Sequence, residues 1–135
     1  HSPPERNYVY GVERAHGLPT ARRQARRRQG SGTKYLDNLY EGYGLCVEVD
    51  GLAAHPPEGR WRDAHRDNAN LVQGTETLRY GWPDATTNRC RTAAEIAVVL
   101  RRRGWKGNPR PCGPACPVGR SPGAGLNNEP EPGCG

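Results

Sequence analysis

Apolar and polar residues alternate along residues 45–50, a period of two that is typical of a β-strand with one buried face. The apolar positions of this segment are Leu45, Val47 and Val49. A turn centred on Gly42-Tyr43 would pair this strand with residues 35–40 as a hairpin. In that register Asp37 faces Glu48 directly, and Asp50 lies on the same face. The pattern therefore predicts three carboxylates on one face of a hairpin.

The remaining segments follow helical spacing or strand alternation, separated by Gly and Pro. The expected elements are a helix over residues 2–17, a basic strand within 18–29, the two hairpin strands, a helix over 57–74, a strand over 75–80 and a helix that a capping box at Thr92-Ala-Ala-Glu95 opens and Gly104 ends. The apolar positions expected to pack the middle helix are Trp61, Ala64, Leu71 and Val72. The order helix, three strands, helix, strand, helix predicts an α/β (α+β) fold.

The predicted carboxylates suggest a cation site. Carboxylates opposite one another in a sheet, with Cβ atoms about 5 Å apart, destabilise the pair unless their charge is neutralised. Mg²⁺ or Mn²⁺ would neutralise it and would keep several water ligands. The alternative is a solvated polar face on an edge hairpin.

Three runs of residues carry a family resemblance: V-E-V-D-G-x3-H at 47–55, R-D-N at 66–68 and G-x3-L-R-Y-G-W at 74–82. Over residues 2 to about 105 the chain resembles the very-short-patch-repair-like endonuclease domains of the PD-(D/E)XK nuclease superfamily. The resemblance implies a restriction-endonuclease-like core with a mixed central sheet.

The resemblance also implies roles for individual residues. Asp37 and Glu48 match the two metal-binding positions, and Asp50 stands where the superfamily usually has Lys. His55 matches the histidine that the very-short-patch branch uses instead. Glu5 matches an acidic residue of the first helix that reaches the metal, although a glutamate also stabilises a helix N-terminus through the macrodipole.

The charge of the chain suggests a polyanionic partner. The formal net charge is +6 and the isoelectric point is about 9.4. The cationic positions expected to contact DNA are Arg22, Arg23, Arg26, Arg28, Arg66 and Arg79. Enrichment in Arg over Lys is equally explained by a GC-rich genome. Arg66 would otherwise form a salt bridge within its helix, and Arg79 would lie on an exposed strand face.

Composition limits the size of the ordered domain. Hydrophobic residues make up 33% of the chain, and Phe and Met are absent. We expect an endonuclease-like domain over residues 1–106 and a Pro/Gly-rich tail over 107–135 that is largely disordered. With no apolar run of 18 residues and no signal-peptide region, the protein is expected to be soluble and cytoplasmic, with no membrane partner. Proteins that this chain resembles often carry a further N-terminal region.

The five cysteines are too few and too scattered for a secreted disulfide framework. The Cys112/Cys116 spacing is compatible with structural Zn²⁺, for which Cys90 and a histidine would complete four ligands. His16 and His65 are interpreted as surface or capping residues.

These observations predict a Mg²⁺-dependent endodeoxyribonuclease that hydrolyses phosphodiester bonds. Asp37 and Glu48 would hold the metal, Asp50 would bind a second ion or orient water, and His55 would transfer a proton. Two alternatives stay open. One is a catalytically inactive DNA-binding or regulatory module on the same fold, and the other is a small zinc-stabilised interaction domain.

Overall fold

The computed structural model describes residues 3–27, 34–50 and 57–119. The chain divides into two compact units. The sheet unit comprises Ala21–Trp82, and the helical unit comprises His1–Thr20 together with Pro83–Gly135. No helix in the described segments is long and apolar enough to cross a membrane.

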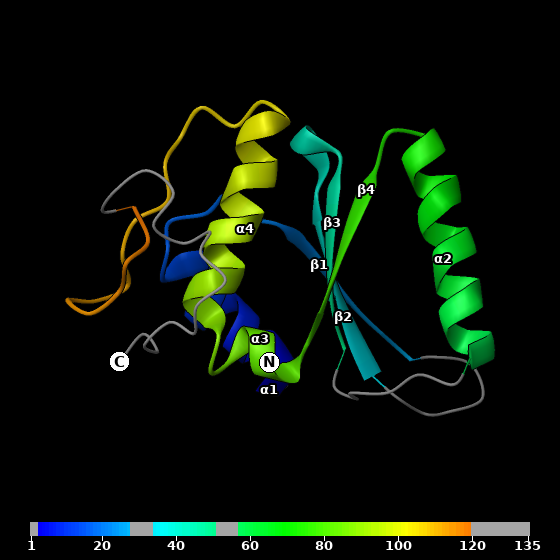
Figure 1. Cartoon of the computed structure of the whole chain (residues 1–135), viewed down its shortest axis with the longest axis horizontal. Helices are drawn as coiled ribbons and strands as arrows, with labels where there is room; N and C mark the ends of the chain where they lie inside the picture. The colour runs from blue at the N-terminus through cyan, green and yellow to red at the C-terminus, as the bar shows by residue number, and fades with distance from the viewer. Residues whose placement is uncertain (1–2, 28–33, 51–56, 120–135) are drawn as a thin grey trace. The chain divides into compact units, whose positions relative to one another are not determined.

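The sheet unit contains one four-stranded mixed sheet with the strand order β1-β2-β3-β4 (Figure 1). Its strands are β1 (Arg22–Arg27), β2 (Lys34–Tyr40), β3 (Leu45–Asp50) and β4 (Glu76–Gly81). Neighbouring strands are antiparallel from β1 to β3, whereas β4 is parallel to β3. A parallel pair requires a crossover, and α2 (Pro57–Val72) forms it. The predicted α+β class and the mixed sheet are confirmed.

The β2–β3 hairpin has the register that the sequence predicts. Tyr40 pairs with Leu45, and Asp37 pairs with Glu48. The connection is a short 3-10 turn, η2 (Glu41–Tyr43), followed by Gly44 at φ 62°. Glycine adopts this left-handed conformation without the steric cost of a Cβ atom, which lets the chain reverse between the two strands.

The helix α2 turns a different face to the sheet from the one predicted. Its large apolar residues are exposed, with Trp61 at 67%, Leu71 at 54% and Val72 at 88% of their full accessibility. Ala64 is exposed as well. The inward positions are instead Asp63, Arg66, Asp67 and Asn70, which follow helical spacing. The prediction of an apolar buried stripe is wrong because the sheet face that α2 covers is itself charged.

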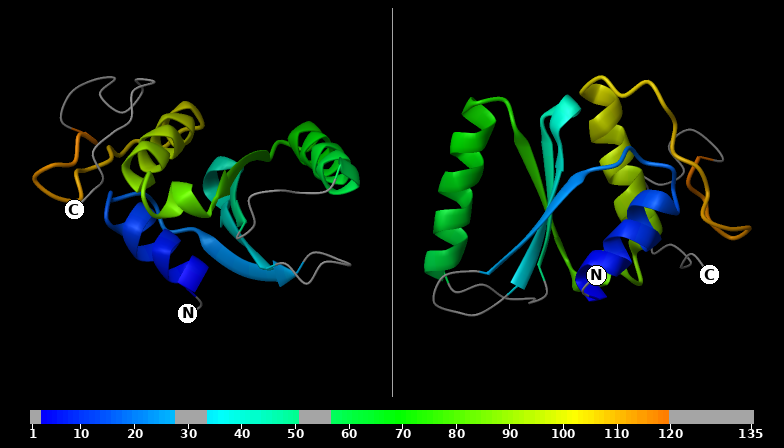
Figure 2. Two further views of the ribbon diagram at one scale, coloured as in Figure 1. Left: turned by 60° about the horizontal axis from the view of Figure 1, so that its bottom comes forward. Right: turned by 180° about the vertical axis from the view of Figure 1, so that it is seen from behind.

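The helical unit is built on two packed helices (Figure 2). A short α1 (Pro3–Arg6) continues as a π-helix, η1 (Asn7–Arg14), which contacts α4 (Arg89–Arg102). The one-turn helix α3 (Trp82–Ala85) precedes α4. Buried side chains line both helices at helical spacing: Tyr8, Val9 and Val12 on η1, and Ala93, Ile96, Ala97 and Leu100 on α4.

The start of α4 lies earlier than predicted. The helix begins at Arg89, and the Thr92 amide already donates a hydrogen bond of 3.1 Å to the carbonyl oxygen of Asn88. Thr92 therefore lies in the first helical turn and is buried, so the capping-box prediction is wrong. The predicted end is confirmed, because Gly104 has φ 113° just beyond the last helical residue.

The segment after α4 packs against the helical unit, which differs from the tail predicted to begin at residue 107. Cys116 and Val118 are buried in a small cluster with Cys90 and Ala94. Gly119 has φ 74°, and a Cβ atom there would lie 2.6 Å from the Pro109 carbonyl oxygen, so the backbone approaches as only glycine allows. Residues 107–119 therefore belong to the packed unit. Residues 120–135 lie outside the described residues, and their predicted disorder stays a prediction.

Candidate functional site

The three predicted carboxylates share the polar face of the sheet. Asp37 on β2 lies opposite Glu48 on β3, and Asp50 follows two residues along the same strand. Glu48 is 3% and Asp50 6% exposed, whereas Asp37 is partly exposed. Burying a carboxylate is costly unless it is paired, so the partners of Glu48 decide what this face can do.

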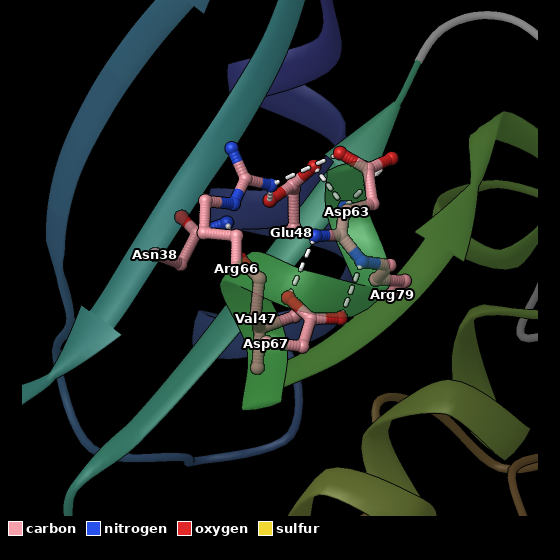
Figure 3. A network of polar contacts seen from close by, with 7 residues as sticks. All are labelled: Asn38, Val47, Glu48, Asp63, Arg66, Asp67 and Arg79. Carbon is pink, nitrogen blue, oxygen red and sulfur yellow. Dashed lines mark hydrogen bonds and ion pairs between the residues drawn. The ribbon is translucent and has the colours of Figure 1, made fainter. Parts of the chain in front are cut away.

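Both carboxylate oxygens of Glu48 are held by arginines (Figure 3). Arg66 on α2 reaches Glu48 Oε2 at 2.9 Å, and Arg79 on β4 reaches Oε1 at 2.5 Å. Arg79 also binds both oxygens of Asp67, at 2.7 and 2.8 Å. Such a forked arginine–carboxylate pair fixes the planes of both groups. In the described structure two guanidinium groups therefore neutralise the charge of Glu48.

Asp63 adds a third carboxylate to this network. It is buried and lies 3.6 Å from both Arg66 and Arg79. The predicted salt bridge of Arg66 within its helix is present with Asp63, but the shorter contact of Arg66 is with Glu48 on β3. The interpretation of Arg79 as a residue of an exposed strand face is wrong, because its side chain is largely enclosed between Glu48 and α2.

Two pKa shifts reflect the charge of this face. Burial alone would lower the pKa of Arg79, but the hydrogen bond to Asp67 and the charges of Glu48, Asp67 and Asp63 raise it above its usual value. Arg79 is therefore a permanent cation. Burial, with the negative charges of Asp37 and Glu48, raises the pKa of Cys46 to about 12. The Cys46 thiol stays protonated and is a poor nucleophile.

An open groove of about 630 Å³ lies beside this network. Asp37 lines it together with Arg22 and Arg23 of β1 and Asn70 of α2. Arg22 is exposed and pairs with Glu41 at 2.7 Å, a surface contact that salt screens readily. The groove thus places the Asp37 carboxylate near Arg22, whose side chain lies on the same face of the sheet.

His55 and Arg28 lie outside the described residues, as does the side chain of Arg26, so their predicted roles stay predictions. Glu5 lies on α1, in the helical unit.

The cysteines predicted for zinc meet in the helical unit. One ligand atom each of Cys90, Cys112, Cys116 and His16 lies within 4.8 Å of the others. His16 is fully buried, so its interpretation as a surface or capping residue is wrong. Helical spacing could have identified it, since His16 lies four residues after Val12 and eight after Tyr8 on the buried stripe of that segment.

No protein-family model, curated protein or solved structure matches this chain.

Proposed function

We propose that the polar face of the sheet unit hydrolyses phosphodiester bonds in DNA with the help of Mg²⁺ or Mn²⁺. The observation that carries the proposal is the hairpin register, which pairs Asp37 with Glu48 and brings Asp50 to the same face. Carboxylates in this arrangement suit a hard cation that keeps part of its water shell. A bound ion would polarise the scissile phosphate and lower the pKa of an attacking water.

The groove beside Asp37 supports a nucleic-acid substrate. Its walls include Arg22, whose planar guanidinium group suits phosphate oxygens. A volume of about 630 Å³ is within the usual range of ligand sites. The order helix, three strands, helix, strand also supports a restriction-endonuclease-like core.

The arginines on Glu48 determine how a metal ion would enter. Both oxygens of Glu48 are engaged, so an ion that binds there competes with Arg66 and Arg79. Arg66 is the partner that can be released, because its side chain is 39% exposed, whereas that of Arg79 is 27% exposed and is also held by two hydrogen bonds to Asp67. Released from Glu48, its guanidinium could pair with a phosphate oxygen of the substrate.

Nicking of supercoiled plasmid DNA tests the proposal. We expect the parent chain to nick DNA with Mg²⁺ or Mn²⁺ but not in chelator, and Asp37→Asn to lose the activity. Glu95→Gln, which neutralises an exposed carboxylate on α4, is the matched control and should nick at the parental rate. Parental cleavage by Asp37→Asn under the same metal and salt would overturn the proposed site.

A second candidate is a DNA-docking module without catalysis, and the arginines on Glu48 favour it. A carboxylate neutralised by two guanidiniums has less need of a metal ion than an unpaired one. This module would bind DNA with strong salt dependence but would not cut it under any metal. Binding without nicking by the parent, lost on Arg22→Ala together with Arg23→Ala, would favour docking over hydrolysis.

A further inference from the structure

A group of soft ligands lies in the helical unit and takes no part in the proposed hydrolysis. It consists of the imidazole of His16 and the sulfur atoms of Cys90, Cys112 and Cys116. Three of the four residues are buried, and Cys112 is partly exposed. Three thiolates and one imidazole are a donor set that favours Zn²⁺ over Mg²⁺ or Ca²⁺.

The spacing of the sulfur atoms fits tetrahedral coordination. Zn–S bonds of about 2.3 Å at tetrahedral angles hold two sulfur ligands about 3.8 Å apart. The Cys90 and Cys112 sulfur atoms are 3.8 Å apart, and those of Cys116 and Cys90 are 3.4 Å apart. Four donors that all lie within 4.8 Å of one another can therefore close around one ion with small side-chain movements.

The ring of His16 is oriented as a zinc ligand would be. Its Nδ1 lies 2.8 Å from the carbonyl oxygen of Val12. Because a carbonyl can only accept, Nδ1 must carry the proton, and in the neutral ring the lone pair is then on Nε2. Histidines that bind metal commonly donate their other ring nitrogen in this way, which fixes the tautomer and the ring plane.

The backbone around the group is also held in place. The Arg110 amide donates to the carbonyl oxygen of His16 at 2.8 Å, which ties the segment after α4 to the end of η1. The Cys116 amide donates to the Gly113 carbonyl oxygen at 3.1 Å, which closes a turn between Cys112 and Cys116. Each ligand thus comes from a segment whose position is fixed by hydrogen bonds or by a helix.

The oxidation state of Cys90 determines whether the donor set is complete. Cys90 takes part in a disulfide, whereas Cys112 and Cys116 do not. A dithiol reductant would transfer two electrons and two protons to that disulfide, yielding two thiols, and would itself become a disulfide. Zinc would then displace the thiol protons of the cysteines that bind it.

We propose that His16, Cys90, Cys112 and Cys116 of the reduced chain bind one structural Zn²⁺ ion that joins the N-terminal helix, the start of α4 and the segment after α4. All four coordination positions are filled by protein, so the ion would stabilise the unit rather than act on a substrate. The site is independent of the sheet-unit carboxylates, and its test does not depend on nuclease activity.

Metal content and Co²⁺ spectroscopy test the proposal. The full chain is purified under reducing conditions, and zinc is measured by elemental analysis. We expect one Zn²⁺ per chain. After exchange, Co²⁺ should give the visible absorption bands of a tetrahedral site and the charge-transfer bands of thiolate ligands. Cys112→Ser should weaken binding at least about tenfold, because hydroxyl replaces a thiolate ligand.

Two further variants distinguish loss of a zinc ligand from other effects of substitution. Cys46→Ser is the matched control, since Cys46 is also a free thiol but lies in the sheet unit. It should retain zinc and the Co²⁺ spectrum. His16→Cys should retain the ion with a spectrum shifted toward four sulfur ligands, which a merely structural histidine would not produce. Absence of zinc from the reduced parent, or equal zinc affinity of the parent and Cys112→Ser, would overturn the site.

Discussion

Both units bury polar side chains, and they stabilise them in different ways. In the sheet unit the carboxylate of Glu48 meets two guanidinium groups of the same chain. In the helical unit a histidine and three cysteines converge on one point. Fixed cations of the chain pair with the carboxylates of the first cluster, whereas the four donor residues of the second cluster are those for which a zinc ion is proposed. A cluster of potential ligands must therefore be judged by the cations already present in it.

The largest effect is expected from removing the central cation of the sheet unit. Arg79→Met keeps most of the side-chain volume but leaves Glu48 and Asp67 without a shared guanidinium. Breaking a buried ion pair from one side costs about 3 to 5 kcal/mol, and partial solvent access of Arg79 places the expected loss near the lower end. Denaturant unfolding in the presence of chelator measures it.

The control for this prediction is Arg62→Met, on an exposed position of the same helix that carries Arg66. It should change the free energy of unfolding by no more than about 0.5 kcal/mol. Equal losses for the two variants would mean that the network adds little to stability.

A smaller change in stability is expected when either of the two opposed carboxylates, Glu48 or Asp37, is neutralised, and its sign should differ between them. Glu48→Gln removes the charge that Arg66 and Arg79 bind, and hydrogen bonds to charged groups contribute about 1.5 to 3 kcal/mol, so we expect a loss of that order. Asp37→Asn removes repulsion and should leave stability unchanged or raise it by up to about 1 kcal/mol. If repulsion between the two carboxylates were the only effect, both variants would be more stable than the parent. Thermal unfolding in chelator distinguishes the cases, and a gain for Glu48→Gln would contradict the ion-pair description.

The smallest effect at neutral pH concerns Cys46, whose ionisation changes stability only under alkaline conditions. The folded-state pKa of this thiol is about 12, against an ordinary value of 9.0. The unfolded chain therefore loses the proton first, and the stability that the neutral thiol contributes is present below pH 9.0 and is lost between 9.0 and about 12. Free energies of unfolding across this window should fall more steeply for the parent than for Cys46→Ala. Parallel curves would show that Cys46 ionises normally in the folded chain.

The hairpin could be predicted from sequence because its determinants are local. Strand alternation fixes which residues share a face, and a short turn fixes the register, so Asp37 opposite Glu48 follows from nearby residues alone. The ion pairs of Glu48 could not be predicted from nearby residues. Its partners Arg66 and Arg79 come from α2 and β4, and only the parallel crossover brings them together.

The orientation of α2 and the burial of His16 differ from the predictions for separate reasons. The apolar residues of α2 predict a buried face, but Trp61 and Leu71 are exposed because the sheet face opposite is charged. Only the fold shows which surface lies opposite the helix. His16 is predicted as a surface or capping residue from its side chain alone, whereas its spacing from Val12 places it among the buried positions.

The position of β1 at the edge of the sheet has a consequence for self-association. An edge strand exposes unpaired backbone groups, and these can recruit the edge of another molecule into a continuous sheet that grows into aggregates. The strand Arg22–Arg27 carries arginine at four of its six positions. Two such edges would repel each other on approach, which disfavours pairing between molecules at this edge.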